Sequence, residues 1–194
     1  MLEQFKVKPE DAVRVREEDL RETVEAIFKK MGLDRKDSAF GADVLLKADM
    51  RGVDTHGVSN ILRGYVTGYG NGEINPHPEW IVTRETPSTA NIDGDRGLGV
   101  IVAPKAMELA IEKAKEVGMG VVTIHNSRHL GMASYHALMA VEQDMIGTCM
   151  TSCPPSVLPT FGAEPLLGTN PIAVAAPARK EAPFVFDAAM SAVA

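Results

Sequence analysis

The first third of the chain has apolar residues at the spacing of amphipathic helices. Between residues 20 and 31 they fall on one helical face: Leu20, Val24, Ile27, Phe28 and Met31. Gly32 follows where a helix C-terminal cap belongs. The same spacing predicts a second helix over about residues 38–50 and a third over about residues 58–69.

The pattern changes after residue 70, where Gly, Asn and Pro become frequent and short β-rich runs follow. Strands are predicted at residues 80–84, 89–93, 120–125, 146–152, 172–176 and 183–186, and helices at residues 100–117 and 133–143. The strand, helix and strand between residues 120 and 152 form a βαβ-type unit. The sequence therefore predicts an α/β protein with a helical N-terminal domain over residues 1–75 and a sheet-containing domain over residues 76–194.

The charge balance excludes several classes of partner. Against 26 Asp and Glu the chain has 20 Lys and Arg, and its net charge of −6 repels phosphate backbones and anionic lipids. The basic residues do not cluster, so we expect no nucleic acid and no membrane partner. Residues 1–10 lack the apolar core of a signal peptide, and no window approaches the roughly 20 apolar residues of a membrane span. We expect a cytoplasmic protein.

The common nucleotide-binding signatures are absent from the sequence. Neither G-x-G-x-x-G nor the P-loop pattern occurs. The run Gly118-Met119-Gly120 precedes a predicted strand instead of following one, which is the wrong place to hold a pyrophosphate at a helix N-terminus. A dinucleotide, if one binds, must be held in another way.

Two histidines are candidates for proton transfer. Asp54 or Thr55 is a natural N-cap for the third helix, which places His56 near the amino end of that helix. His129 lies in a loop that leaves a strand and enters a helix, where open α/β sheets place ligands, and the adjacent Arg128 suits an anionic substrate. An unperturbed imidazole pKa of about 6.5 suits proton exchange near neutrality. The alternatives are a capping or surface role for His56 and a loop-filling role for His129.

A metal site is a further alternative for these side chains. The metal-ligating residue types in this region are His125, His129, His136, Cys149 and Cys153. However, His125 ends a predicted strand, His136 is in the middle of a predicted helix, and no H-E-x-x-H or C-x-x-C pair occurs. We therefore expect no metal.

Four segments taken together resemble one family. They are residues 48–58 (ADMRGVDTHGV), residues 126–131 (NSRHLG) with Tyr135, residues 161–171 (FGAEPLLGTNP) and residues 186–189 (FDAA). In this order they resemble the malate/L-lactate dehydrogenase family, which includes ureidoglycolate, sulfolactate and diketogulonate oxidoreductases. The resemblance extends from about Val15 to Ala194.

The resemblance implies an oxidoreductase that transfers a hydride between NAD or NADP and a 2-hydroxy or 2-keto acid of the malate or lactate type. It also implies a non-Rossmann fold of two domains, one helical and N-terminal and one a mixed-sheet cofactor domain, and usually a homodimer. The histidines that match His56 and His129 both become candidates for proton transfer. The cofactor contacts that the resemblance implies are Cys153, Asp187, Ala188 and Ala189.

The chain departs from the family pattern where a substrate is expected. Relatives commonly have Arg four residues after the first histidine, whereas this chain has Asn60 there and keeps the later Arg63. Asn60, Arg63 and Arg128 are therefore the candidates for substrate binding, and the identity of the 2-hydroxy acid is left open. Met190 stands where Thr or Ser is usual, which leaves NAD against NADP open.

Family members continue well past Ala194, so we expect a C-terminally truncated chain. Two alternatives to a working dehydrogenase stay open. One is a truncated, non-catalytic member of the family, and the other is a metal-dependent hydrolase that uses the histidines.

Overall fold

The computed structural model describes residues 10 and 12–191; residues 1–9 and 192–194, which carry part of the signal-peptide and truncation predictions, lie outside the described residues. The helices are α1 (Glu17–Lys30), α2 (Arg35–Met50), the 3₁₀ helix η2 (Asp54–His56), α3 (Val58–Gly70), α4 (Gly99–Val117) and α5 (Ala133–Val141). The strands are β1 (Ile81–Glu85), β2 (Thr89–Asp93), β3 (Val121–His125), β4 (Gly147–Met150), β5 (Ile172–Ala176) and β6 (Phe184–Ala188). These elements confirm the predicted α/β class. None of the described helices is long and apolar enough to cross a membrane.

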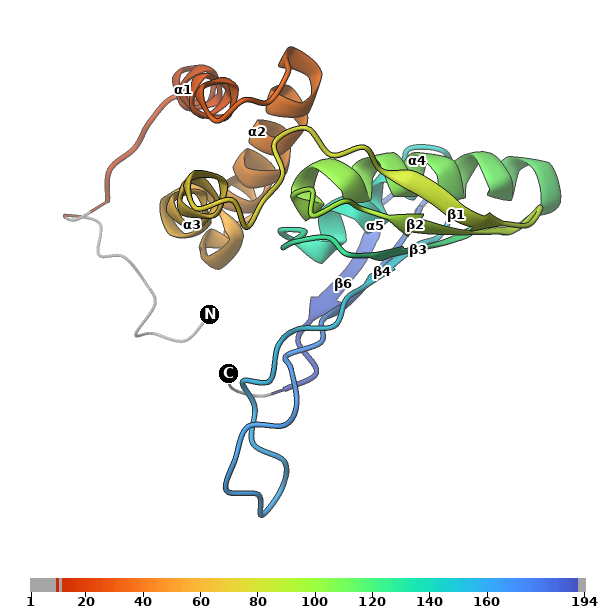
Figure 1. Cartoon of the computed structure of the whole chain (residues 1–194). Coiled ribbons are helices and arrows are strands. Elements are labelled where there is room, and N and C mark those ends of the chain that lie inside the picture. Colours follow the sequence, from red (N-terminus) through yellow and green to blue (C-terminus); the bar gives the residue numbers. More distant parts are fainter. Residues whose placement is uncertain (1–9, 11, 192–194) are drawn as a thin grey trace.

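Helices α1–α3 group on one side of the molecule, beside the end of α4 (Figure 1). Phe28 of α1, Leu45 of α2, Tyr65 of α3 and Val100 of α4 belong to one buried apolar cluster. Gly41 permits the close approach of α1 and α2, because a Cβ at this position would lie 2.8 Å from the Phe28 ring. The three helices therefore share their core with α4, and the domain boundary at residue 75 remains a prediction.

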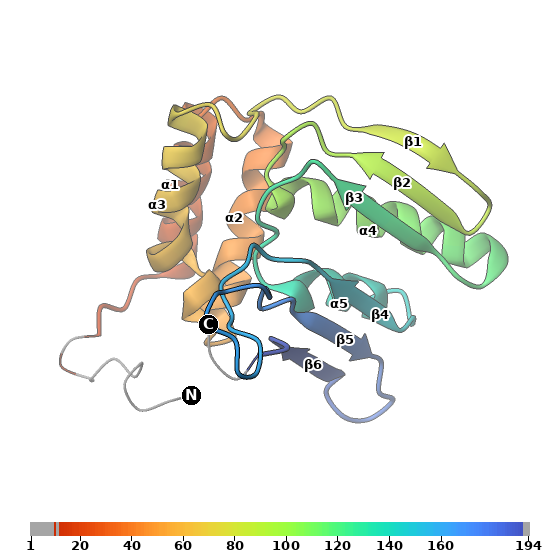
Figure 2. The same ribbon diagram turned by 60° about the horizontal axis from the view of Figure 1, so that its bottom comes forward.

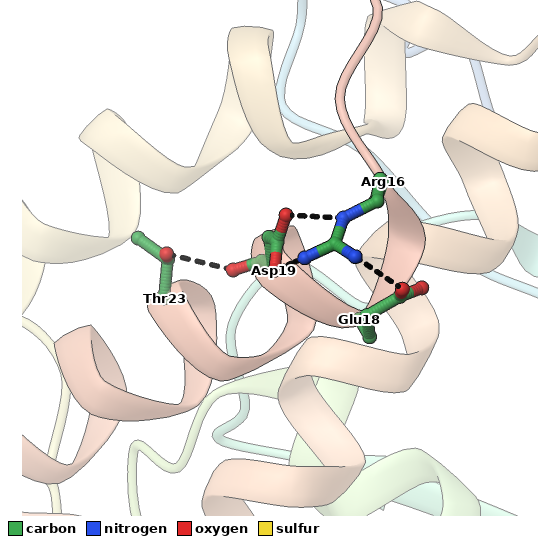
Figure 3. A network of polar contacts seen from close by, with 4 residues as sticks. All are labelled: Arg16, Glu18, Asp19 and Thr23. Atoms are coloured by element: carbon green, nitrogen blue, oxygen red, sulfur yellow. Dashed lines mark hydrogen bonds and ion pairs between the residues drawn. The ribbon is translucent and has the colours of Figure 1, made fainter.

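Charged side chains, not a cap, mark the start of α1, which has no side-chain N-cap hydrogen bond. The Arg16 guanidinium donates to both carboxylate oxygens of Asp19 at 2.8 Å and lies 3.4 Å from Glu18 (Figure 3). The Thr23 hydroxyl donates to the Asp19 carbonyl at 2.8 Å. Acidic side chains in a first turn interact favourably with the positive end of the helix dipole, although exposed ion pairs each contribute little.

The strands form two three-stranded sheets with different topologies, and Figure 2 shows them side by side. In the first sheet, β1 is antiparallel to β2, and β2 is parallel to β3. Helix α4 connects the two parallel strands and packs against β3 and β2. In the second sheet, β4, β5 and β6 are antiparallel neighbours.

The predicted βαβ unit around α5 is wrong in its strand pairing. Strands β3 and β4 flank α5 in sequence but belong to different sheets, and the parallel crossover is β2–α4–β3. The physical reason is the small face of α5, where Ala137 packs with Ala173 and Ala175 of β5. A Cβ at Gly147 would lie 2.0 Å from the Ala137 carbonyl oxygen, so α5 lies directly on β4. This close contact commits α5 to the second sheet.

The connection between β4 and β5 is long and extends away from the helices (Figure 1). Within it, Val157 and Leu167 pair as an isolated antiparallel bridge. At its base the backbone N–H of Cys153 donates to the Asn170 side-chain oxygen at 2.9 Å. The side chain of Asn170 therefore holds the two ends of this connection together.

The shared helical core leads to a stability prediction. Phe28 is fully buried, so Phe28→Ala should lower the free energy of unfolding by about 3–5 kcal/mol through lost apolar burial and the cavity left behind. Phe161, which is fully exposed in the long connection, is the matched control, and Phe161→Ala should change it by less than about 0.5 kcal/mol. Denaturant unfolding measures both values. Equal effects of the two substitutions would contradict the described core.

Candidate active site

His129 lies in the loop between β3 and α5, and one edge of its ring faces α3. The Tyr65 hydroxyl oxygen is 2.7 Å from Nδ1 of His129, and the Gly131 backbone N–H donates to the same nitrogen over 3.3 Å. Because an amide N–H can only donate, the neutral ring accepts at Nδ1 and carries its proton on Nε2. Desolvation, and secondly the charge of His56, lower the pKa of His129 to about 4.

His56 stacks on His129. The ring centroids are 5.4 Å apart and the ring planes differ by 23°. Nδ1 of His56 lies 2.9 Å from the Thr55 hydroxyl oxygen. Desolvation lowers the pKa of His56, while the negative charge of Asp187 opposes this shift. The structure thus brings together the two predicted proton-transfer residues, and both favour the neutral imidazole.

The local structure before α3 corrects the predicted cap. Asp54 and Thr55 form η2 with His56, and the N-cap position of α3 is Gly57, which supplies no side chain. Asp49 of α2 takes over this role, because its carboxylate accepts the Val58 N–H at 2.9 Å. Sequence reasoning missed Asp49 as a supporting residue, although it lies within the 48–58 motif.

Gly57 is required by the same carboxylate. A Cβ at residue 57 would lie 1.6 Å from Oδ1 of Asp49, which is a direct overlap. Burial raises the pKa of Asp49, and the hydrogen bond from Val58 opposes that shift. The short segment that carries His56 is therefore fixed by an aspartate from the preceding helix and by the absence of a side chain at Gly57.

Asp187 of β6 links the second sheet to the histidines. Its Oδ2 accepts the backbone N–H of Ser134, in the first turn of α5, at 2.7 Å. A carboxylate is favoured at this position because the helix N-terminus carries positive partial charge. Its charge also acts on His56, as the direction of its effect on the His56 pKa shows. Asp187 therefore has a direct contact with α5 and an electrostatic effect on His56.

The other predicted cofactor contacts lie on segments that are joined to one another. Ala188 ends β6 and pairs with Ile172, and Ala189 follows it. The Met190 N–H then donates to the Thr169 carbonyl at 2.7 Å. Because the neighbouring Asn170 holds Cys153 as described above, the segments around residues 153, 169 and 189 form one connected group.

The three predicted substrate-binding residues differ in their surroundings. Arg128 donates from Nε to the Glu73 carbonyl and from Nη1 to the Ser127 carbonyl, both at 2.9 Å. The Asn60 amide donates to the Asp54 carbonyl at 3.2 Å and so braces η2. Arg63 is an exposed residue of α3, two positions before Tyr65. Backbone carbonyl groups therefore accept hydrogen bonds from the side chains of both Arg128 and Asn60.

The side chains considered for a metal site are dispersed. Nε2 of His125 lies 3.6 Å from the Asp93 carboxylate, and Nε2 of His136 is 2.8 Å from the Leu130 carbonyl. Within the part of the chain that the structure describes, no three His, Cys, Asp or Glu side chains are grouped so that they could hold a metal ion.

Known proteins resemble this chain in sequence and in fold. The malate/L-lactate dehydrogenase family profile matches residues 15–194. The malate dehydrogenase of Pyrococcus abyssi is 48% identical over 184 residues, which are 95% of this chain and 50% of that protein. The L-sulfolactate dehydrogenase of Methanocaldococcus jannaschii is 47% identical over 149 residues, 77% of this chain and 43% of that protein. The solved malate dehydrogenase of Pyrococcus horikoshii superimposes with a TM-score of 0.90 at 49% identity, covering 93% of this chain and 51% of that one.

The fold and the ordered motifs define a mixed α/β protein of the dehydrogenase type. The chain belongs to the malate/L-lactate dehydrogenase family, as the resemblance of its motifs predicted. It spans about half the length of the relatives and solved structures that it matches.

The overlap at Gly57 gives a prediction about the support of His56. Gly57→Ala should lower the free energy of unfolding by about 1–3 kcal/mol, because the new methyl group displaces the Asp49 carboxylate from Val58. Gly64 of α3 is the matched control: a Cβ there meets nothing within 4 Å, and Gly64→Ala should stabilise the helix by about 0.5–1 kcal/mol. Denaturant unfolding compares the two. A loss of stability in both variants would contradict the specific role of Asp49.

The buried His136 predicts a pH dependence of stability. His136 is 1% exposed, and desolvation lowers its pKa from 6.5 to about 4. Between these values the unfolded chain binds more protons than the folded one, so stability is complete above pH 6.5 and decreases as the pH falls towards 4. For each unit by which the pH falls between 6.5 and 4, this residue alone should raise the equilibrium constant for unfolding by about tenfold.

Denaturant unfolding at several pH values tests this dependence. His136→Gln keeps a donor for the Leu130 carbonyl but cannot titrate, so its stability should depend less steeply on pH. His125, whose side chain is 61% exposed, is the control, and His125→Gln should retain the parent slope. If the free energy of unfolding of the His136 variant depended on pH as steeply as that of the parent, His136 would not contribute to the sensitivity of the fold to acid.

Proposed function

We propose that this chain carries the proton-transfer site and part of the cofactor site of an NAD- or NADP-linked 2-hydroxy-acid oxidoreductase. The single observation that carries the proposal is the stacked pair of His56 and His129, whose ring centroids are 5.4 Å apart. The charge of Asp187, which lies in the family motif of β6, raises the pKa of His56. Relatives named malate dehydrogenase and L-sulfolactate dehydrogenase support the reaction class. The substrate would accordingly be a 2-hydroxy acid or the corresponding 2-keto acid.

We infer that His129 is the residue that exchanges a proton with the substrate oxygen. Its Nδ1 is occupied by Tyr65 and Gly131, so Nε2 is the nitrogen left for a substrate, and it has no hydrogen-bond partner among the described residues. His56 contributes by stacking on His129, and positive charge on His56 disfavours positive charge on His129. The lowered pKa keeps His129 neutral near neutrality. Acceptance of a hydroxyl proton at Nε2 requires the neutral tautomer that carries its proton on Nδ1.

An arginine is proposed as the holder of the substrate carboxylate. Guanidinium groups suit carboxylates because they donate two parallel hydrogen bonds. Arg63 is exposed on α3, and none of the side-chain hydrogen bonds or ion pairs of the described residues engages its guanidinium group. The side chains of Arg128 and Asn60 already donate hydrogen bonds to backbone carbonyls, so we assign them supporting contributions to substrate binding.

The cofactor segments fit a nicotinamide nucleotide. Cys153, Asp187, Ala188 and Ala189 lie on connected backbone segments, and the nearby Ser191 hydroxyl is buried with no hydrogen-bond partner in the described part of the chain. Such a polar atom is suited to a bound polar group. When bound, the nicotinamide supplies or accepts the hydride, while the chain's own residues orient the acid and transfer the proton.

We also propose that the protein works as a homodimer in the cytoplasm, as the family resemblance implies. Apolar side chains on the second sheet support association with further polypeptide, because Met150, Phe184 and Phe186 are 65%, 60% and 48% exposed. Size-exclusion chromatography with light scattering measures the mass in solution.

The activity test uses the purified 194-residue chain with NADH or NADPH and a panel of oxaloacetate, pyruvate and other 2-keto acids. We expect oxidation of the reduced cofactor, and His129→Gln should lower kcat by about 10²-fold or more, the usual contribution of general acid–base catalysis. His125→Gln, a substitution of an exposed histidine, should retain the parent rate.

The outcomes of this test separate the proposed roles. Full activity in His129→Gln, with loss in His56→Gln, would transfer the proton role to His56. An absence of both turnover and cofactor binding by calorimetry would contradict the function proposed for this chain and favour a non-catalytic family member. Hydrolytic activity that depends on added metal would instead favour the hydrolase alternative.

A further inference from the structure

The contact between Tyr65 and His129 joins two segments that lie 64 residues apart in sequence. Tyr65 is 4% exposed, so nearly all of this residue is removed from water. Two groups from the protein approach Nδ1 of His129, the Tyr65 hydroxyl at 2.7 Å and the Gly131 N–H at 3.3 Å. They differ in one property: the hydroxyl can donate or accept a hydrogen bond, whereas the amide can only donate.

We propose that Tyr65 is a positioning residue that permits His129 to carry a proton on Nδ1, so that Nε2 can give a proton to the substrate oxygen and take it back. This inference rests on the proposed role of His129. Tyr65 lies outside the histidine pair and acts on the substrate only through His129.

The proton inventory shows why such a partner is required. To donate from Nε2 to a keto oxygen, His129 must first be an imidazolium with protons on both nitrogens. The proton on Nδ1 then needs a hydrogen-bond acceptor. The Gly131 N–H cannot accept a hydrogen bond, whereas the Tyr65 hydroxyl oxygen can. After transfer, the ring is neutral with its proton on Nδ1, the substrate holds a hydroxyl group, and Tyr65 still accepts from Nδ1. The oxidation direction reverses these steps.

In the resting neutral ring the same hydroxyl rotates and donates to Nδ1, in parallel with Gly131. The Tyr65 hydroxyl itself stays protonated, because burial, and secondly the charge of Tyr69, raise its pKa well above the usual range. The titratable groups that face His129 are Tyr65 from α3 and His56 from η2, and Asp187 from β6 acts through His56. By rotating, the Tyr65 hydroxyl can donate to Nδ1 of the neutral ring or accept from Nδ1 of the imidazolium.

The first test observes the ring directly and does not depend on activity. Tyr65→Phe keeps the aromatic ring but leaves only the Gly131 N–H at Nδ1. In the 194-residue chain with ¹⁵N-labelled histidine, we expect the Nδ1 resonance of His129 to move towards that of an imine nitrogen with weaker hydrogen bonding. On acidification, a smaller fraction of His129 should be protonated than in the parent at each pH, because a charge-assisted bond to Tyr65 favours the imidazolium more than a neutral bond favours the neutral ring.

Tyr69→Phe is the matched control. Tyr69 lies on the same helix and packs on the same core, so the variant removes a hydroxyl without touching Nδ1. It should leave the His129 resonances in place. Unchanged resonances and unchanged protonation in Tyr65→Phe, or a greater protonated fraction, would overturn the inference, since Tyr65 would then only fill space or stabilise the neutral ring.

The second test separates this inference from the proposed function. If both are correct, Tyr65→Phe should lower kcat for 2-keto acid reduction by about tenfold, with KM changed by less than about twofold, because transfer and not binding is impaired. Failure of the proposed function appears as an absence of turnover and of cofactor binding in the parent chain, and failure of the proton role of His129 appears as full activity in His129→Gln. Failure of the present inference appears as an unchanged His129 spectrum in Tyr65→Phe, whatever the activity of either variant.

Discussion

Helix α2 packs against α1, α3, α4 and α5, and the side chains of Val44, Leu45 and Leu46 are at most 1% exposed. Desolvation of these apolar side chains is the principal favourable contribution that holds these helices together. Because α2 is surrounded in this way, the polar residues on its remaining surface have fixed positions. Asp43 accepts hydrogen bonds from α1 and from Tyr135 of α5 at 2.8 and 2.9 Å, so α2 orients both neighbours.

The position of the histidine pair follows from this packing. Asp49 near the end of α2 fixes the start of α3, and with it η2 and His56. The loop that carries His129 is fixed from the other side by β3 and α5, and Tyr65 closes the contact between the two parts. Two rings from distant segments can stack at 5.4 Å only because each is held by an element packed on α2.

Asp187 couples this region to the second sheet. Its carboxylate is held at the N-terminus of α5, where helix dipole and backbone hydrogen bond both favour the negative charge. The same charge raises the pKa of His56 and so opposes the lowering of that pKa by desolvation. Asp187, in the segment proposed to contact the cofactor, therefore also influences the protonation of His56, so the two proposed functions share one carboxylate.

The sequence by itself determined the helices and strands and two helix ends, since these depend on local spacing and on glycines such as Gly32 and Gly118, which have φ angles of +106° and +87°. Its ordered motifs also indicated the family and the residues to examine. Only the tertiary structure decided the strand pairing, the use of Asp49 in place of Asp54 or Thr55, and the bond between Tyr65 and His129. The last two of these features join residues 9 and 64 positions apart, and their geometry depends on packing that no local pattern specifies.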